Sequence, residues 1–224
     1  MSKIEFVDHS TVTLYKSNAS DLDVCRSAWV SQNTEAHEKE AEEGRVEGLI
    51  NFLVRNGHHS TLEHGQFTFI VETPIFVARE VFRHRSSSFS EISARYVEMK
   101  PRFYVPSLDR PTRQEGKVGN YTFTQDKQLA ADAQRHIKNV SNEAWNAYQA
   151  MLESGVAREV ARDVLPVNLL TTFWMTVNPR NLMHFLDLRT APDALQEIRL
   201  ISEQMETIFE QQMPLTHKAW KANK

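Results

Sequence analysis

Residues 83–96 concentrate side chains that can bind anions and polar groups. They hold three arginines, one histidine, one glutamate and five serines in the order R-H-R-S-S-S-F-S-E-I-S-A-R-Y. Guanidinium forks match phosphate oxygens and serine hydroxyls add short-range donors, while a lone carboxylate can accept from a ribose hydroxyl or a base N–H. The segment therefore predicts recognition of a phosphorylated, planar, polar molecule. An exposed loop without a ligand is the alternative, but the segment lacks the Lys, Pro and Gly enrichment of disordered chains.

The residues around this segment predict how it is held. Thr73 as N-cap and Pro74 at the first helical position would begin a helix. Residues three and four apart share a helix face, so Arg79, Glu80 and Arg83 would lie along one side. The serines after Arg85 favour side-chain-to-backbone bonds and predict an irregular segment.

A second polar cluster occupies residues 57–64, G-H-H-S-T-L-E-H, just before a predicted strand at 67–71. Three histidines and Glu63 suggest a metal site, but the spacing matches no H-E-x-x-H or comparable ligand pattern. Cationic or hydrogen-bonding roles are therefore favoured for this turn.

A third cluster spans residues 176–189, T-V-N-P-R-N-L-M-H-F-L-D-L-R. Pro179 predicts a helix start, and Arg180 and His184 would share a face four residues apart. Solvated or capping groups are the alternative. Upstream, a helix over 156–165 would place Arg158 and Arg162 on one face.

Other segments predict the scaffold. Residues 4–15 are rich in β-branched residues and predict a strand region, and residues 106–122 predict a polar loop. The remaining predicted elements are a strand at 168–177 and helices at 20–29, 35–55, 123–153 (capped by Gly155) and 193–212.

Composition narrows the class of protein. The 224 residues are 41% hydrophobic and 25% charged, with a net charge of −3, which predicts one ordinary globular domain over residues 1–224 and argues against a dedicated nucleic-acid binder. No apolar run reaches the roughly 18 residues of a membrane span, and the N-terminus lacks the apolar core of a signal peptide, so a cytoplasmic protein is expected. No G-x-G-x-x-G or Walker pattern occurs.

Two further features have ordinary explanations. The single cysteine, Cys25, rules out an intrachain disulfide and is expected to be a buried helix residue instead of a nucleophile. The acidic run Glu38, Glu40, Glu42 and Glu43 could suggest the metal carboxylates of a nucleotide pyrophosphatase. Because no second E-x-x-D pair follows, a solvated helix face is favoured.

Together the three clusters resemble the motifs of flavin-dependent thymidylate synthases. Residues 83–96 resemble the signature R-H-R-x-x-S-x-N-E-x-S-x-R-Y at every fixed position except Ser90, where the family has Asn. Residues 57–64 resemble G-H-x-[ST]-x-x-E-H, and residues 176–189 resemble T-V-N-x-R-x-L-x-x-F-L-x-L-R, with Arg162 matching the A-R-x-x-L-P motif. The resemblance runs from about Gly57 to Arg199.

This resemblance implies an activity and a fold. Such enzymes reductively methylate dUMP to dTMP for nucleotide biosynthesis, taking the carbon from methylenetetrahydrofolate and the hydride from FAD reduced by NADPH. Their fold is α+β, a twisted, mainly antiparallel sheet flanked by long helices, assembled as a homotetramer with shared active sites. No nucleophilic cysteine, metal, nucleic acid or membrane is implied.

Matching positions imply the site residues. Arg189 would be catalytic, set against the uracil edge. The FAD contacts would be His58, Ser60, Arg83, His84, Arg85, Glu91, Asn178, Arg180 and His184. The dUMP contacts would be Glu80, Arg83, Glu91, Ser93, Arg95, Arg162 and Arg189.

The chain departs from the family pattern at several positions. Ser90 replaces Asn, His184 stands where some members have Asn, and Leu170 replaces a tyrosine. Residues 190–193 lack the histidine and glutamine common there. These changes indicate a divergent member.

Two other classes of protein remain open from the residues alone. One is a metal-dependent nucleotide phosphohydrolase using His58, His59, Glu63 and His64. The other is a single-stranded RNA binder in which Phe89 and Tyr96 stack on bases beside the arginines. Bound flavin would colour the protein and distinguishes the synthase from both.

Overall fold

The computed structural model describes residues 3–31 and 43–224, and these form two compact units. The first unit contains residues up to His9, 73–78 and 91–171, and the second contains residues 10–72, 79–90 and 172–224. Two sequence predictions fall partly outside the described residues. They are the acidic run, of which Glu38, Glu40 and Glu42 are not described, and the predicted helix at 35–55, of which residues 35–42 are not described. That residues 1–224 act as one functional domain stays a prediction.

The second unit is built on a four-stranded antiparallel sheet with the strand order β2-β3-β8-β4. The strands are β2 (Thr11–Ser17), β3 (Phe67–Pro74), β8 (Leu170–Val177) and β4 (Ser88–Glu91). The last two residues of β3 and the first two of β8 belong to the first unit. β3 and β8 are central and rich in aromatic and β-branched residues, as a strand buried on both faces requires. The α+β fold with a mainly antiparallel sheet is therefore confirmed.

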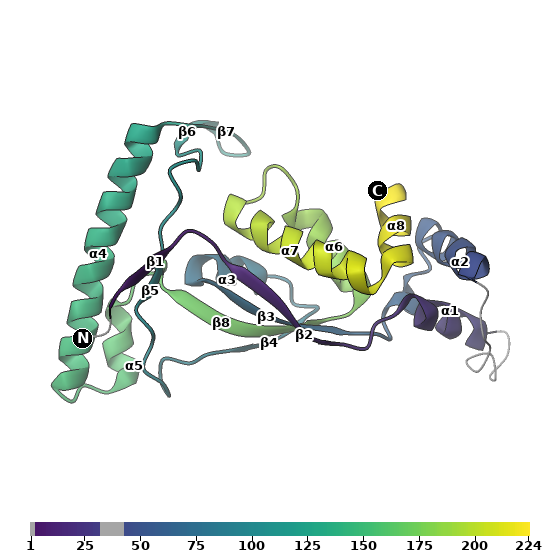
Figure 1. Cartoon of the computed structure of the whole chain (residues 1–224), viewed down its shortest axis with the longest axis horizontal. Helices are drawn as coiled ribbons and strands as arrows, with labels where there is room; N and C mark the ends of the chain where they lie inside the picture. The colour runs from purple at the N-terminus through teal and green to yellow at the C-terminus, as the bar shows by residue number, and fades with distance from the viewer. Residues whose placement is uncertain (1–2, 32–42) are drawn as a thin grey trace. The chain divides into compact units, whose positions relative to one another are not determined.

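The helices of this unit are α1 (Asp21–Val30), α2 (Glu43–Arg55), α6 (Pro179–Arg189), α7 (Gln196–Gln212) and α8 (Pro214–Ala222), together with the end of the helix that follows β3. Figure 1 shows α6 and α7 lying along the sheet, and α1, α2 and α8 grouped at one end of it. α7 contacts β2 and α6, while α8 packs against α2 and α7. Phe209 of α7 meets Phe67 of β3 edge to face at 6.0 Å, and both rings are fully buried. The sequence did not predict α8, which follows the predicted 193–212 helix after Met213.

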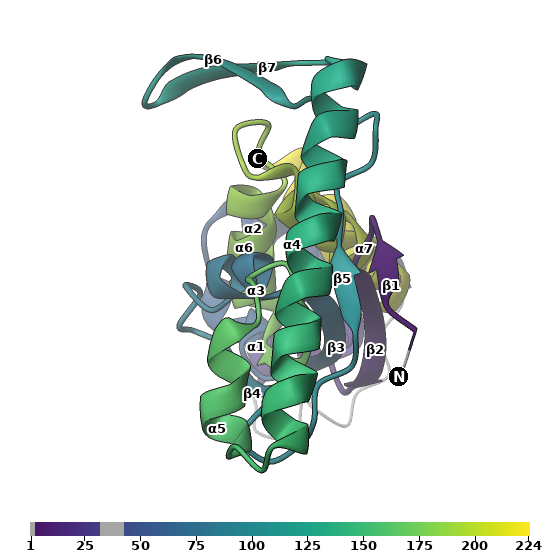
Figure 2. The ribbon, with the colours of Figure 1, turned by 90° about the vertical axis from the view of Figure 1, so that its left-hand side faces the viewer.

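The first unit is organised by the long helix α4 (Lys127–Glu153), which runs beside α5 (Arg158–Ala161) in Figure 2. β1 (Glu5–Val7) pairs in parallel with β5 (Arg102–Tyr104). The core packs Phe103 against Trp145 and Tyr148, and the Tyr148 hydroxyl accepts a hydrogen bond from the Met99 N–H at 3.2 Å. Gly155, at φ +83°, follows the C-cap as predicted.

Several local predictions are wrong. Thr73 and Pro74 belong to β3, and α3 (Ile75–Val81) begins after them, because its first N–H groups donate to the Leu169 and Val167 carbonyls. The serine segment is not wholly irregular, since residues 88–91 form edge strand β4 beside β8. The predicted loop at 106–122 contains the hairpin β6 (Arg113–Lys117) and β7 (Asn120–Thr124), so α4 starts at Lys127 behind the Asp126 N-cap.

Within the described residues, no helix combines the length and apolarity needed to cross a membrane.

Candidate active site

The first signature residues, 83–87, form a tight turn between α3 and β4. Successive turn bonds hold it, from the His84 N–H to the Val81 carbonyl at 3.1 Å and from the Ser87 N–H to the His84 carbonyl at 3.2 Å. The Phe82 ring packs against the rings of Phe89 in β4 and Phe173 in β8, with centroid distances of 4.9 Å to each. This aromatic anchor leaves the polar side chains between the two phenylalanines free to face outward.

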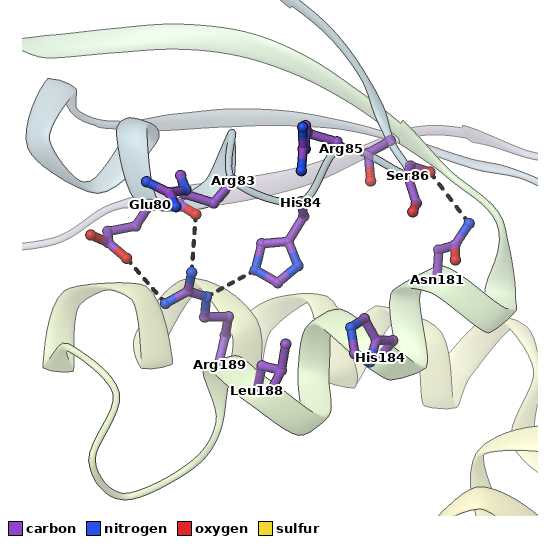
Figure 3. A pocket seen from close by; sticks show the side chains of 10 residues that line it. Glu80, Arg83, His84, Arg85, Ser86, Asn181, His184, Leu188 and Arg189 are labelled. Atoms are coloured by element: carbon purple, nitrogen blue, oxygen red, sulfur yellow. Dashed lines mark hydrogen bonds and ion pairs between the residues drawn. The ribbon is translucent and has the colours of Figure 1, made fainter. Parts of the chain in front are cut away.

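Helix α6 forms the opposite wall of a pocket of about 540 Å³ (Figure 3). Asn178 caps the helix by accepting from the Asn181 N–H at 2.9 Å, and Pro179 is the first helical residue, as predicted. The pocket is lined by Glu80, Arg83, His84, Arg85, Ser86, Ser87, Asn181, His184, Leu188 and Arg189. The structure thus brings together six predicted site residues that lie about 100 positions apart in the chain.

Arg189 is the most tightly held of these side chains. Its Nε–H donates to His84 Nε2 at 2.9 Å, and its terminal nitrogens donate to Glu80 Oε2 at 3.1 Å and to the Glu80 carbonyl at 3.3 Å. The His84 ring packs edge to face on the buried Phe185 ring at 4.7 Å. Burial, and then the positive charge of Arg189, lower the pKa of His84 to about 4, so the ring is neutral at pH 7.

The 57–64 turn lies near the start of α6. Arg180 of α6 forms an ion pair with Glu63, and the 3₁₀ helix His59–Leu62 contacts α6. His58 and Ser60 are exposed there, and the His58 ring packs edge to face on Phe52 at 5.7 Å. His58, Ser60, Asn178 and Arg180 are therefore presented by neighbouring segments of the same unit.

The same geometry counts against the metal alternative. Glu63 is engaged by Arg180. Among residues 3–31 and 43–224, no group of three or more His, Cys, Asp or Glu side chains is arranged to hold a metal ion.

Four predicted residues belong to the first unit. The Glu91 carboxylate accepts from the Thr171 hydroxyl at 2.6 Å. Arg95 forms an exposed ion pair with Glu159 at 3.1 Å, and Arg162 Nε donates to the Glu159 carbonyl at 3.3 Å. Two cationic side chains therefore gather around one residue, Glu159.

Ser93 supports the same segment, because its hydroxyl accepts from the Arg95 N–H at 3.3 Å.

Several lining residues were not predicted. Asn181 donates to the Ser86 carbonyl at 3.3 Å and so ties α6 to the signature turn. With His184 and Leu188 it follows the i, i+3, i+7 spacing of one helix face, and this spacing is the signal in the sequence that could have identified it. Glu159 carried no motif signal.

Cys25 lies in α1 and is fully buried, as predicted. Burial, and then the nearby Asp21 carboxylate, raise the pKa of its thiol to about 11. A thiol that is protonated and inaccessible is a poor nucleophile.

Comparison with known proteins shows the family of the chain. Residues 13–215 match the Thy1 family, described as thymidylate synthase complementing protein. The chain is 42% identical over 234 residues to the flavin-dependent thymidylate synthase of Streptomyces avermitilis, covering 99% of this chain and 94% of that protein. It is 40% identical over 218 residues to that of Thermotoga neapolitana, covering 97% and 94%.

Solved structures extend the similarity to three dimensions. The crystal structure of the UMP/dUMP methylase PolB from Streptomyces cacaoi bound with 5-Br dUMP has a TM-score of 0.91 to this chain. It is 42% identical and covers 98% of this chain and 97% of its own. Its counterpart bound with 5-Br UMP has a TM-score of 0.90 at 41% identity, covering 99% and 97%. By its motifs, its fold and its similarity over nearly the whole length, the chain belongs to the family of flavin-dependent thymidylate synthases.

Proposed function

We propose that the protein methylates dUMP reductively to dTMP, with methylenetetrahydrofolate as carbon donor and FAD reduced by NADPH as hydride carrier. The observation that carries this proposal is the pocket in which Arg189 is fixed beside the Arg83-His84-Arg85 turn. The arginines that line this pocket supply positive charge and N–H donors to a phosphorylated, planar ligand. The enzymes of this family are named for a flavin cofactor and a nucleotide product, which are ligands of this kind.

The donor set around the pocket fits a dinucleotide such as FAD. Arg83 and Arg85 present guanidinium forks that suit diphosphate oxygens, and Ser86 and Ser87 add hydroxyl donors. Asn178 uses its carbonyl oxygen in the cap, so its amide N–H groups remain for a ligand. When bound and reduced, FAD would supply the hydride.

The chain's own residues would bind the nucleotide and stabilise charge. Arg189 provides a fixed cation at the uracil edge, where negative charge develops when the pyrimidine is activated. Arg95 and Arg162 are proposed to bind the nucleotide more generally. The exposed ion pair of Arg95 with Glu159 is a weak competitor, because exposed ion pairs contribute about 0–1 kcal/mol. Arg162 makes a single exposed hydrogen bond of 3.3 Å to the Glu159 backbone carbonyl.

Methylation of UMP is the second candidate. It is favoured by one finding, that PolB is described as a UMP/dUMP methylase and was solved with analogues of both nucleotides. The departure at Ser90 also lies in the signature segment, whose neighbouring Glu91 is assigned to both ligands.

Flavin binding provides the first test. The purified protein should bind FAD at about one per chain in titration calorimetry, and Arg83→Ala should weaken this binding. Arg79→Ala is the matched control, since Arg79 is an exposed arginine of α3 that does not line the pocket. Absence of FAD binding would contradict the proposal.

Competing the two substrates provides the second test. The protein is incubated with NADPH, FAD and methylenetetrahydrofolate plus equal dUMP and UMP, and the products are measured by mass spectrometry. Faster formation of dTMP supports the first candidate. Faster formation of the methylated ribonucleotide replaces it with the second.

A further inference from the structure

The guanidinium of Arg189 is fixed by two side chains that do not belong to its own helix. Glu80 lies in α3, His84 lies in the turn that follows, and Arg189 is the last residue of α6. Figure 3 shows the Glu80 carboxylate and the His84 ring directed at the guanidinium, with hydrogen bonds of 3.1 and 2.9 Å. A third bond, of 3.3 Å, goes to the backbone carbonyl of Glu80. The Arg189 side chain is only 21% exposed, while that of Glu80 is 46% exposed. The three hydrogen bonds together restrict the plane of the guanidinium.

The contact with His84 also determines where the imidazole proton lies. The Arg189 Nε–H can only donate, so His84 Nε2 must accept and the single ring proton must be on Nδ1. The edge-to-face contact with Phe185 at 4.7 Å fixes the ring plane. Protonating the ring would remove the acceptor and place a second positive charge beside Arg189.

Part of the guanidinium remains available after these contacts. Arginine carries five N–H donors, and the described residues engage three of those on Arg189. Two N–H groups on the terminal nitrogens are left for a ligand in the pocket. A pyrimidine edge carries acceptor atoms that such a pair can bind.

We infer that Glu80 and His84 are positioning residues, which act on the reaction by fixing the plane of the Arg189 guanidinium so that its two remaining N–H groups face the nucleotide base. This inference rests on the proposed function. It differs from the roles implied by the family resemblance, in which Glu80 contacts dUMP and His84 contacts FAD directly. Direct contacts would act independently of Arg189, whereas positioning acts only through it.

Double-mutant cycles test that difference. Single-turnover methylation with pre-reduced flavin is measured for Glu80→Ala, His84→Ala, Arg189→Ala and the two doubles with Arg189→Ala. In the parent, Glu80→Ala and His84→Ala should each lower kcat on the order of tenfold or more, with a smaller change in KM for dUMP. In the Arg189→Ala background the same changes should cost less than about threefold, because residues in one network are non-additive. Equal losses in both backgrounds would overturn the inference.

Conservative variants and a control keep the result interpretable if an alanine variant fails to fold. His84→Gln retains a neutral acceptor for the Nε–H and should recover much of the rate lost in His84→Ala. His84→Lys offers no acceptor and should recover none. Arg79→Ala, on the exposed side of α3, should leave the rate unchanged.

A spectroscopic readout needs neither nucleotide nor flavin. In the ¹⁵N-histidine NMR spectrum, the His84 ring, assigned by its loss in His84→Gln, should be a neutral Nδ1–H tautomer at pH 7. Arg189→Ala should raise its pKa and remove the single-tautomer signal. A ring with its proton on Nε2, or one that Arg189→Ala leaves unchanged, would overturn the inference. The predicted tautomer without methylation of either nucleotide would instead overturn the proposed function.

Discussion

At the scale of single residues, substitution of Arg189 tests whether this side chain acts on the chemical step or only on nucleotide binding. A cation that acts on charge appearing only as the pyrimidine is activated should affect kcat. Arg162, which is proposed to bind the nucleotide more generally, should affect mainly binding. Arg189→Ala should lower kcat by on the order of 10²–10³. Steady-state and single-turnover kinetics with reduced flavin measure this, and a change confined to the KM for dUMP would contradict the catalytic role.

Arg189→Lys keeps the positive charge at this position but removes the planar guanidinium, so it tests the geometry of the donors. One ammonium cannot reproduce the planar set of donors that meets His84 Nε2, Glu80 Oε2 and the Glu80 carbonyl together. The variant should therefore be badly impaired although its charge is kept, and near-normal kinetics would show that charge alone suffices.

Substitution of Cys25, unlike substitution of Arg189, should leave the activity largely unchanged. Its thiol is fully buried, and burial raises its pKa to about 11, so Cys25→Ser should keep most of the activity while costing on the order of 1 kcal/mol of unfolding free energy. The native protein should also resist alkylation by iodoacetamide. Complete loss of activity in a folded Cys25→Ser protein would point to covalent cysteine chemistry.

At the scale of the element, α6 carries both a structural cap and proposed ligand contacts. Asn178 accepts from the Asn181 N–H as N-cap, and its amide donors are proposed for FAD. Asn178→Asp keeps the cap acceptor but loses those donors, so it should keep the melting temperature and weaken FAD binding. Asn178→Ala should lose FAD affinity and also about 1 kcal/mol of stability.

Thermal unfolding and FAD titration of the two Asn178 variants are compared directly. Full FAD affinity in Asn178→Asp would assign the residue to the cap alone. Equal stability losses in the two variants would show that the cap contributes little to this helix.

At the scale of the whole molecule, several apolar side chains remain exposed on the first unit. They lie on the β6–β7 hairpin and on α4, and include Val118, Tyr121, Phe123, Leu129 and Val140. Single exposed apolar side chains are ordinary on a protein surface, and only a contiguous patch indicates a partner. We propose that the chain forms the homotetramer that the family resemblance implies.

The proposed sharing of active sites gives a quantitative test. The residues assigned to dUMP fall in both compact units, with Arg162 in the first and Arg189 in the second. Light scattering with FAD present should report a tetramer. Subunits carrying Arg162→Ala should bind dUMP weakly, and subunits carrying Arg189→Ala should turn it over slowly. Mixed assemblies of the two should recover activity at dUMP concentrations where each parent is poorly active. A monomer, or mixed assemblies no more active than the parents, would contradict shared sites.

Much of the site could be predicted from the sequence because its chemistry is local. The 83–96 signature, the 57–64 turn and the 176–189 helix are each contiguous, and their residue types define what they bind. The Asn178 cap, the Pro179 start and the strand ending at Val177 depend on neighbours within a few residues. Local propensity and capping therefore determined α6 and the strand before it.

Tertiary structure alone decided how these pieces meet. The serines of residues 88–90 are weak strand formers, and they become β4 because β8 offers an unpaired edge. Arg189 finds its partners 105 and 109 positions away, at His84 and Glu80. Periodicity specifies which face of a helix is buried but not which distant helix packs against it. The sequence therefore determined which chemical groups are present at the site. The approach of α6 to the end of α3 and to the turn that follows it decided that Arg189 would be held by the Glu80 carboxylate and the neutral His84 ring.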